Sequence, residues 1–200
     1  MFTRGQKVVI YAAGVLTLVF AGVTTWMELR PAPAALPQYW ALPAFSLTNQ
    51  DGQPVTLDNF KGKVWLADFI YTTCPGQCPL ITAHMARLQQ KLPEDADVRI
   101  ASFSTDPQTD TPPVLKAYAR KYAASDRWTF LTGPKDRVYD LIEHGFKLPI
   151  SAPVGAQIVH STRIMLVDRK GNVRTFYDGL SQDGDDQIIA DIKKLLQESP

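Results

Sequence analysis

The chain has 200 residues, which is enough for one domain with a substantial core after a tail and an anchor are set aside. Lys and Arg number 21 and Asp and Glu number 20, so the formal net charge is +1. Residues 1–30 hold three basic groups and one acid, which leaves 18 basic and 19 acidic groups on residues 31–200. This balance shows no basic patch of the kind that binds a phosphate backbone, so we expect no nucleic-acid partner.

The N-terminal segment is predicted to be a membrane anchor. Residues 8–27 contain no charged residue and are long enough to cross a hydrocarbon core as a helix. Arg4 and Lys7 precede them, which favours a cytoplasmic tail over residues 1–7. The alternative is a cleavable signal peptide, since Ala32-Pro33-Ala34 resembles a cleavage site, but signal h-regions are shorter and proline is unfavourable there.

In both cases the remainder of the chain is exported. The N-terminus lacks the long Arg- and Ser-rich character of a mitochondrial transit peptide. The predicted location is therefore the bacterial inner membrane, crossed once, with the C-terminal domain in the periplasm. Four prolines predict a stiff, extended linker over residues 28–43, and a single domain is expected over residues 44–200.

The predicted elements of this domain alternate between strands and helices. Such alternation implies a mostly parallel sheet with helices on both faces, to which a final hairpin adds an antiparallel edge. In chain order we expect a hairpin of 45–47 and 54–57 around Asp51-Gly52, a strand over 64–71, a helix to about residue 92, a strand over 98–104, a helix from 111 to about 123, a strand over 128–131, a helix from 136 to about 146, strands over 163–167 and 173–177, and a helix over 185–197.

Both cysteines of the chain lie where the strand over 64–71 ends and the next helix begins. The segment Tyr71-Thr72-Thr73-Cys74-Pro75-Gly76-Gln77-Cys78-Pro79 holds them four residues apart, and a helix N-terminus favours thiolate over thiol. Such a pair forms either a disulfide or a clamp for a soft metal ion. An inert structural disulfide is the weaker interpretation, because a bridge that closes so short a loop stabilises little.

This position of the cysteine pair, together with the terminal strand–strand–helix unit, matches the thioredoxin-like plan. The expected fold class is therefore α/β, a thioredoxin-like fold with an N-terminal β-hairpin extension, preceded by a single transmembrane helix. In such sheets ligands gather beyond the carboxyl ends of the strands, where Cys74 and Cys78 lie.

The three histidines are expected to differ in role. His84 is read as an ordinary helix residue, and His144 suits a position near a helix C-terminus. His160 precedes the strand over 163–167, and in a thioredoxin-like plan that strand begins beside the cysteine loop. Its imidazole would then reach both sulfurs, while a solvent-facing loop histidine is the alternative.

Three segments carry a family resemblance. Cys74-Pro75-Gly76-Gln77-Cys78-Pro79 resembles the C-P-x-x-C-P signature of the SCO/SenC copper chaperones. Residues 104–112 resemble the S-x-D-P-x-x-D-T-P segment of that family, and His160-Ser161 with the strand that follows resembles its H-S-x-x-x-x-L-x-D-x-x-G segment. The likeness extends from about residue 45 to residue 196 and includes the N-terminal anchor.

The resemblance implies a membrane-anchored metallochaperone with Cys74, Cys78 and His160 as copper ligands. Family members help to metallate the binuclear copper site of cytochrome c oxidase subunit II, so the implied partners are that subunit, a copper donor and a thiol reductant. Thiolate and imidazole donors suit Cu(I) and also hold Cu(II), whereas structural zinc prefers a fourth ligand. The chain departs from the family at Val159, where an Asp is common.

Neighbouring residues are given simpler roles. Asp106 and Asp110 could orient or approach the metal loop, but a turn and helix-cap role is the favoured interpretation. Met85 and Met165 are soft donors that fit core positions. The main alternative function is a thiol:disulfide oxidoreductase that uses Cys74 and Cys78, although three intervening residues differ from the C-x-x-C spacing. A peroxidase is a third possibility, and the family segments argue against it.

Overall fold

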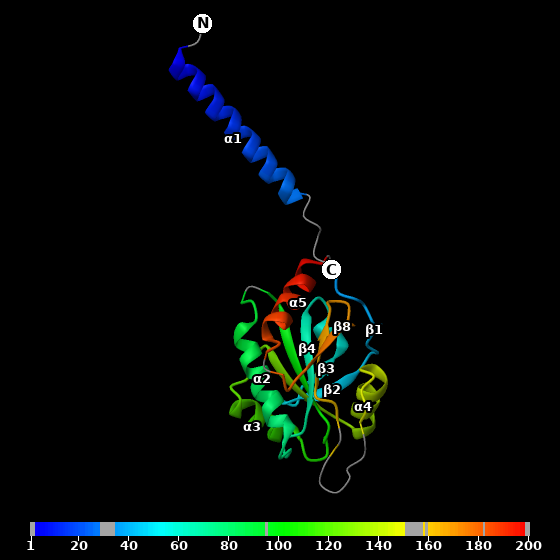
Figure 1. Ribbon diagram of the computed structural model, residues 1–200. Coiled ribbons are helices and arrows are strands. Elements are labelled where there is room, and N and C mark those ends of the chain that lie inside the picture. Colours follow the sequence, from blue (N-terminus) through cyan, green and yellow to red (C-terminus); the bar gives the residue numbers. More distant parts are fainter. Residues whose placement is uncertain are drawn as a thin grey trace. The chain divides into compact units, whose positions relative to one another are not determined.

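The computed structural model describes residues 3–28, 35–94, 96–150, 158, 160–181 and 183–198. The chain divides into two compact units, Met1–Ala35 and Leu36–Pro200. The first contains one helix, α1 (Arg4–Glu28), and the second contains every described strand (Figure 1).

Residues 8–27 are helical, as predicted, and lie within α1. The side chains at 7–10, 12, 23 and 26–28 lie outside the described ones. Among the residues that the structure describes, no helix is both long and apolar enough to span a bilayer. The predicted membrane span over 8–27 is therefore not supported by the structure.

The second unit is built on one eight-stranded sheet. Its strand order is β1-β8-β7-β4-β5-β6-β2-β3. The bounds are β1 (Trp40–Ala41), β2 (Ser46–Asn49), β3 (Pro54–Thr56), β4 (Val64–Ile70), β5 (Val98–Ser104), β6 (Trp128–Thr132), β7 (Arg163–Val167) and β8 (Asn172–Asp178). A 3₁₀ turn, η1 (Leu57–Phe60), follows β3.

The sheet is mixed, which corrects the expectation of a mostly parallel one. Only β4, β5 and β6 run parallel, and the other neighbours pair antiparallel. The β7–β8 hairpin also does not form the edge that was expected. β7 pairs with the central strand β4, and β1 covers β8, with Trp40 opposite Val173. β1 falls within the segment 28–43 that was expected to be linker, of which 29–34 lie outside the described residues.

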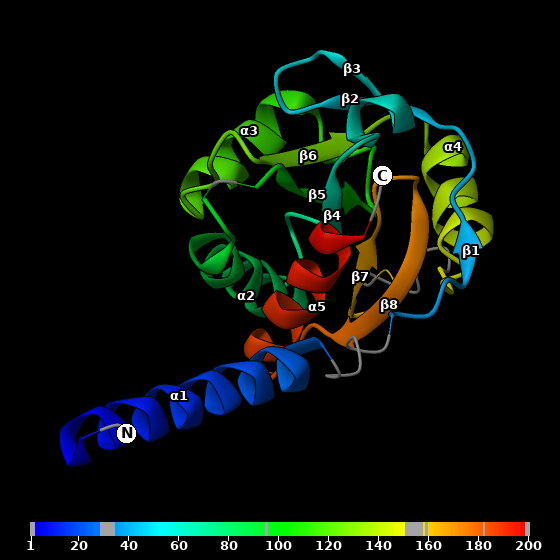
Figure 2. The same cartoon turned by 90° about the horizontal axis from the view of Figure 1, so that it is seen from above.

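Helices cover both faces of this sheet, as predicted (Figure 2). The helices α2, α3 and α5 pack on one face, and α4 with its continuation η2 packs on the other. Their bounds are α2 (Gln77–Lys91), α3 (Pro112–Lys121), α4 (Lys135–Asp140), the π-helical turn η2 (Leu141–Gly145) and α5 (Asp185–Gln197).

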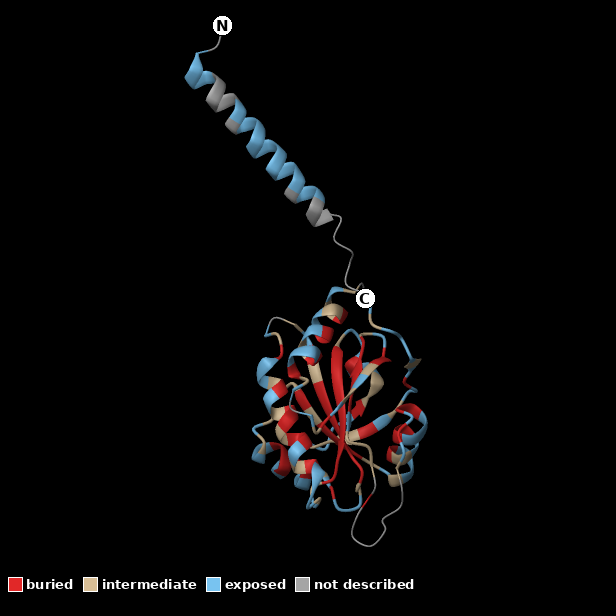
Figure 3. Cartoon of the chain, viewed as in Figure 1, coloured by how far each residue is buried: buried red, intermediate tan, exposed pale blue. Residues whose placement is uncertain are grey.

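The central strand β4 is buried along its whole length (Figure 3). Because successive side chains of a strand point to opposite faces, its residues divide between two cores. Val64, Leu66 and Ile70 join the core beneath α2, α3 and α5, whereas Trp65 and Phe69 join the core beneath α4. This fully buried strand therefore places its carboxyl end, and the cysteine loop after it, between the two cores of the domain.

Local sequence explains the two predicted hairpins. In the β2–β3 turn, Gly52 has φ +76°, a value that favours glycine, and the Asn49 side chain accepts hydrogen bonds from the backbone of Asp51 and Gln53. In the β7–β8 turn, Gly171 has φ +84°, and Asp168 accepts hydrogen bonds from the backbone of the residues around it. Both hairpins lie where the sequence predicted them.

Candidate metal centre

The cysteine loop connects β4 to α2. Strand β4 ends at Ile70, the Cys74 N–H donates to the Tyr71 carbonyl at 3.2 Å, and α2 begins at Gln77. Cys74 therefore lies in the loop and is half-buried, whereas Cys78 lies in the first turn of the helix and is fully buried. Both thiols are free, so the cysteines are not joined in a structural disulfide.

His160 lies beside the buried thiol, although 82 residues separate them in the sequence. Its Nε2 atom is 3.2 Å from the Cys78 sulfur, and its Nδ1 atom is 3.0 Å from the Ser161 carbonyl oxygen. A carbonyl only accepts, so Nδ1 carries the proton and Nε2 directs its lone pair at the sulfur. The Tyr71 ring packs edge-on against the imidazole, with 5.6 Å between ring centroids.

The pKa values of the two thiols are shifted in opposite directions. Partial burial alone would raise the pKa of Cys74, but hydrogen bonds from the Cys78 backbone, the Cys78 thiol and the Gly76 backbone together lower it. Burial raises the pKa of Cys78 far above its ordinary value. Burial also lowers the pKa of His160, which keeps the imidazole neutral and able to donate its lone pair.

A cavity of about 310 Å³ opens over this site. It is lined by Tyr71, Cys74, Pro75, Gly76, Gln77, Ile158 and His160. Its lining includes the sulfur of Cys74 and the imidazole of His160, donors that fit a soft ion such as Cu(I) better than Mg²⁺ or Ca²⁺.

The structure brings two of the three predicted ligands together directly. The third, Cys74, lines the same cavity and hydrogen-bonds with Cys78. Within the described part of the chain, no group of three or more His, Cys, Asp or Glu side chains is already arranged around one point as a metal cluster. Ligation by all three side chains stays a prediction.

Asp110 holds the cysteine loop in place, which is the role considered for it as the alternative to a turn and helix-cap position. Its carboxylate accepts hydrogen bonds from the Thr72 N–H at 3.2 Å, the Thr72 hydroxyl at 2.5 Å and the Ser104 hydroxyl at 2.6 Å. Asp110 is fully buried, so these donors balance much of the cost of burying it. Local sequence did not favour this role, because Thr72 is 38 residues away.

The remaining candidates lie away from the cavity. Met85 and Met165 are fully buried in the two cores, as predicted. His144 is exposed in η2, where its Nδ1 lies 2.9 Å from Asp140. His84, read as an ordinary helix residue, is instead buried and bonded at both ring nitrogens, which corrects that prediction. Val159 lies outside the described residues.

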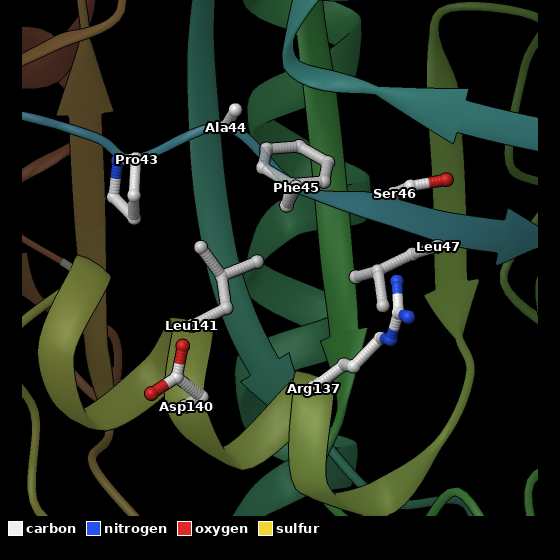
Figure 4. Close-up of a pocket in the computed structure, with 8 residues that line it drawn as sticks. All are labelled: Pro43, Ala44, Phe45, Ser46, Leu47, Arg137, Asp140 and Leu141. Carbon is white, nitrogen blue, oxygen red and sulfur yellow. The ribbon is translucent and has the colours of Figure 1, made fainter.

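A second cavity, of about 420 Å³, lies between β2 and α4 (Figure 4). Phe45, Leu47 and Leu141 line it, with Arg137 and Asp140 at its side. Its described lining includes no cysteine or histidine, so it offers none of the soft donors found beside Cys78.

Comparison with known proteins places these features in one family. The SCO1/SenC family model matches residues 35–197. The SCO1 protein homolog of Bacillus subtilis is 43% identical over 161 residues, which cover 78% of this chain and 83% of that protein.

Two solved structures have the same fold. The structure of BsSco, a member of the Sco family of cytochrome c oxidase assembly proteins in which a disulfide switch was identified, has a TM-score of 0.74 at 41% identity and covers 82% of this chain and 99% of its own. Bradyrhizobium japonicum ScoI, solved with copper bound, has a TM-score of 0.66 at 25% identity and covers 78% of this chain and 99% of its own. These similarities confirm the α/β, thioredoxin-like fold, and the chain belongs to the SCO1/SenC family.

Proposed function

We propose that this protein is a copper metallochaperone that binds one copper ion through Cys74, Cys78 and His160. The observation that carries the proposal is the 3.2 Å approach of the His160 Nε2 atom to the Cys78 sulfur, beside a cavity onto which Cys74 opens. Copper is the metal bound in the related Bradyrhizobium structure, and the donor set fits it.

The open side of the site supports a delivery role. Three protein ligands leave a coordination position facing the cavity, through which a partner's ligand can take the ion. We propose that the recipient is the binuclear copper site of cytochrome c oxidase subunit II, in line with the assembly role of the Sco family. A copper donor and a thiol reductant are the further partners, since the cysteines must be reduced to bind.

The proposed location is the periplasmic side of a bacterial inner membrane. The support for it is the sequence: residues 8–27 carry no charge and follow Arg4 and Lys7. Separation of cell membranes from the soluble fraction tests the location. Recovery of the 200-residue chain in the soluble fraction would exclude attachment through this segment.

Copper titration of the reduced chain tests the ligand assignment. We expect a copper–thiolate charge-transfer band on addition of Cu(II) to the parent chain. His160→Ala should weaken copper binding by more than about 10-fold, since even an outer partner of a ligand is worth about 10-fold or more. The matched control is His144→Ala, which removes an exposed histidine and should change nothing.

The dithiol supplies an internal check on the two cysteines in the same experiment. His160→Ala should still form and break the Cys74–Cys78 disulfide, because the imidazole contributes no sulfur. Copper affinity that is unchanged in His160→Ala would rule out His160 as a ligand. Zinc retention with no copper band in the parent chain would rule out the copper assignment.

A second candidate function is thiol:disulfide exchange, in which the same two cysteines reduce the cysteines of the oxidase site or of other exported proteins. The opposite directions in which the two pKa values move favour it, because they match a half-buried attacking thiolate and a fully buried resolving thiol. In such a reaction the Cys74 thiolate attacks a client disulfide, forms a mixed disulfide and releases one client thiolate. Cys78 then attacks the Cys74 sulfur and releases the second client thiolate. The client is reduced by two electrons, and Cys74 and Cys78 are oxidised to a disulfide.

Alkylation at a range of pH values tests this division of roles. We expect Cys74 to react with iodoacetamide at a pH below that needed by an ordinary thiol, and Cys78 to stay protected in the folded chain. Peptide mass spectrometry reads the two sites separately. Equal alkylation of both cysteines would contradict the division.

A further inference from the structure

His84 lies in α2 six residues after Cys78, and its side chain is buried. Its two ring nitrogens contact two different parts of the chain. The Nδ1 atom is 2.9 Å from the carbonyl oxygen of Gly179, and the Nε2 atom is 2.6 Å from Asp185 Oδ1. His84 therefore connects α2 to the turn after β8 and to the start of α5.

Both of these partners are acceptors. A backbone carbonyl has no proton to give. The Asp185 carboxylate also takes the Lys91 ammonium at 2.9 Å on its other oxygen. Burial alone would raise the pKa of Asp185, but the hydrogen bonds from Lys91 and His84 lower it, so this carboxylate is ionised. The Gly179 carbonyl therefore accepts from Nδ1–H, while Nε2 faces the Asp185 carboxylate.

Gly179 lies between His84 and the segment that carries His160. Its N–H donates to the Thr162 carbonyl at 3.0 Å, while its own carbonyl accepts from His84. A Cβ atom at Gly179 would lie 2.4 Å from the Thr162 oxygen, so only glycine permits this close approach. Thr162 is two residues beyond His160.

These contacts close a circuit around the metal centre. Helix α2 carries both Cys78 and His84. From His84 the circuit runs through Gly179 to Thr162, back along two residues to His160, and across 3.2 Å to the Cys78 sulfur. A shift at any of these contacts changes the distance between the two ligands, because they stand on different elements.

We propose that His84, whose two ring nitrogens contact Gly179 and Asp185, is a positioning residue that holds His160 beside Cys78. The charged groups found facing it are Asp185, which it contacts, and Lys91, which contacts Asp185. The expected effect of His84 on copper affinity rests on the function proposed above. Its expected effect on the position of His160 in the metal-free protein does not depend on that function.

Copper binding to the His84→Gln variant of the 200-residue chain tests the proposal, with His144→Gln as the matched control. One Gln amide places its donors at one end and cannot reach both acceptors. We expect Cu(I) to pass to the chelator bicinchoninate about 10-fold more readily from His84→Gln, the size of effect seen for residues that orient a metal ligand. His144 also has one carboxylate partner but is exposed, so its replacement should have no effect.

A spectroscopic signature separates positioning from general loss of stability. In the Cu(II) form, His84→Gln should weaken the nitrogen hyperfine coupling from His160 and keep the copper–thiolate band. Unchanged affinity and unchanged coupling in a folded His84→Gln would overturn the proposal. Asp185→Asn should act in the same direction, and the double variant should be no worse than either single one, because both changes break one connection.

Nitrogen NMR of the metal-free parent chain is decisive if His84→Gln does not fold. The His84 Nδ1 atom should show a hydrogen bond to the Gly179 carbonyl, and the absence of that contact would overturn the proposal. If the parent chain binds no copper, the proposed function fails, but the His160 ring signals of His84→Gln still test the inference. They should shift from those of the parent chain, while the His144 signals should not.

Discussion

Asp68 is a buried carboxyl group close to the metal centre. It lies in β4 six residues before Cys74, is fully buried, and accepts a hydrogen bond from the Ser102 hydroxyl at 2.5 Å. Its second oxygen has no hydrogen-bond partner among the described residues. Burial raises the pKa of Asp68 to about 7, although the Ser102 hydrogen bond acts in the opposite direction. The negative charge of this group also contributes to the raised pKa of Cys78.

The raised pKa of Asp68 predicts a stability that falls as the pH rises. The folded chain keeps the Asp68 proton up to about pH 7, whereas the unfolded chain releases it near 3.8. The folded state therefore binds more protons between these values, and the free energy of unfolding decreases through that range and levels off above it. The loss is on the order of 4 kcal/mol, since a tenfold difference in proton affinity between the two states corresponds to about 1.4 kcal/mol.

Denaturant unfolding of the parent chain and of Asp68→Asn at pH 5 and pH 8 measures this effect, with tryptophan fluorescence as the signal. Asp68→Asn removes the charge and should be the more stable of the two at pH 8, with little change between the two pH values. A parent chain whose stability does not fall over this range would show that Asp68 ionises normally.

At the scale of elements, the cysteine loop depends on a neighbouring loop for its position. Asp110, in the loop between β5 and α3, accepts hydrogen bonds from Thr72 and Ser104. The parallel pairing of β4 with β5 places the carboxyl ends of both strands at one edge, so two loops distant in sequence meet there. Loop and helix together then place Cys74 and Cys78.

Asp110→Ala should destabilise the domain and weaken copper binding. It leaves the Thr72 N–H and the buried Ser104 hydroxyl without their acceptor, at a cost of about 1–3 kcal/mol for each buried group. The freed loop should also lower copper affinity, because Cys74 follows Thr72 by two residues. Asp110→Asn keeps one acceptor oxygen and should show a smaller loss of both properties. Thermal unfolding and chelator competition measure the two effects, and equal behaviour of Ala and Asn would show that the hydrogen bonds do not matter.

At the scale of the whole molecule, Arg174 joins the two ends of the unit Leu36–Pro200. Its guanidinium is buried and donates to the carbonyls of Leu36 and Pro37 at 2.6 and 2.8 Å, and to both carboxylate oxygens of Glu198 at 2.8 and 2.5 Å. It also lies 3.3 Å from Asp168. One side chain of β8 therefore holds the first and last described segments of the unit.

Arg174→Met should destabilise the unit by about 3 kcal/mol, because it leaves the buried Asp168 carboxylate without its cation. Arg174→Lys should recover little of the stability that Arg174→Met loses, since an ammonium cannot form the forked contacts of a guanidinium. Copper affinity at temperatures where the variant is folded should equal that of the parent chain, because Arg174 is not part of the circuit around His160. Thermal unfolding with chelator competition checks both expectations, and a lower copper affinity in folded Arg174→Met would contradict this separation.

The order of strands and helices follows from patterns within single segments. The apolar run of β4, the Asp-Gly turn and the prolines at the start of α3 act over a few residues, and the elements occur where they predict. The cysteine pair was likewise visible because its two members are four residues apart. β1 escaped prediction because a strand of two residues has no periodicity of its own and forms only by pairing with β8.

What the sequence determined by itself was therefore the family, the α/β plan and the residues Cys74, Cys78 and His160 as candidates. What only the tertiary structure decided was how distant residues meet. Asp185 reaches His84 across 101 residues, and Arg174 reaches Pro37 across 137. Such contacts depend on which elements the sheet places side by side, and a buried polar group takes whatever partner lies there because leaving it unpaired costs free energy.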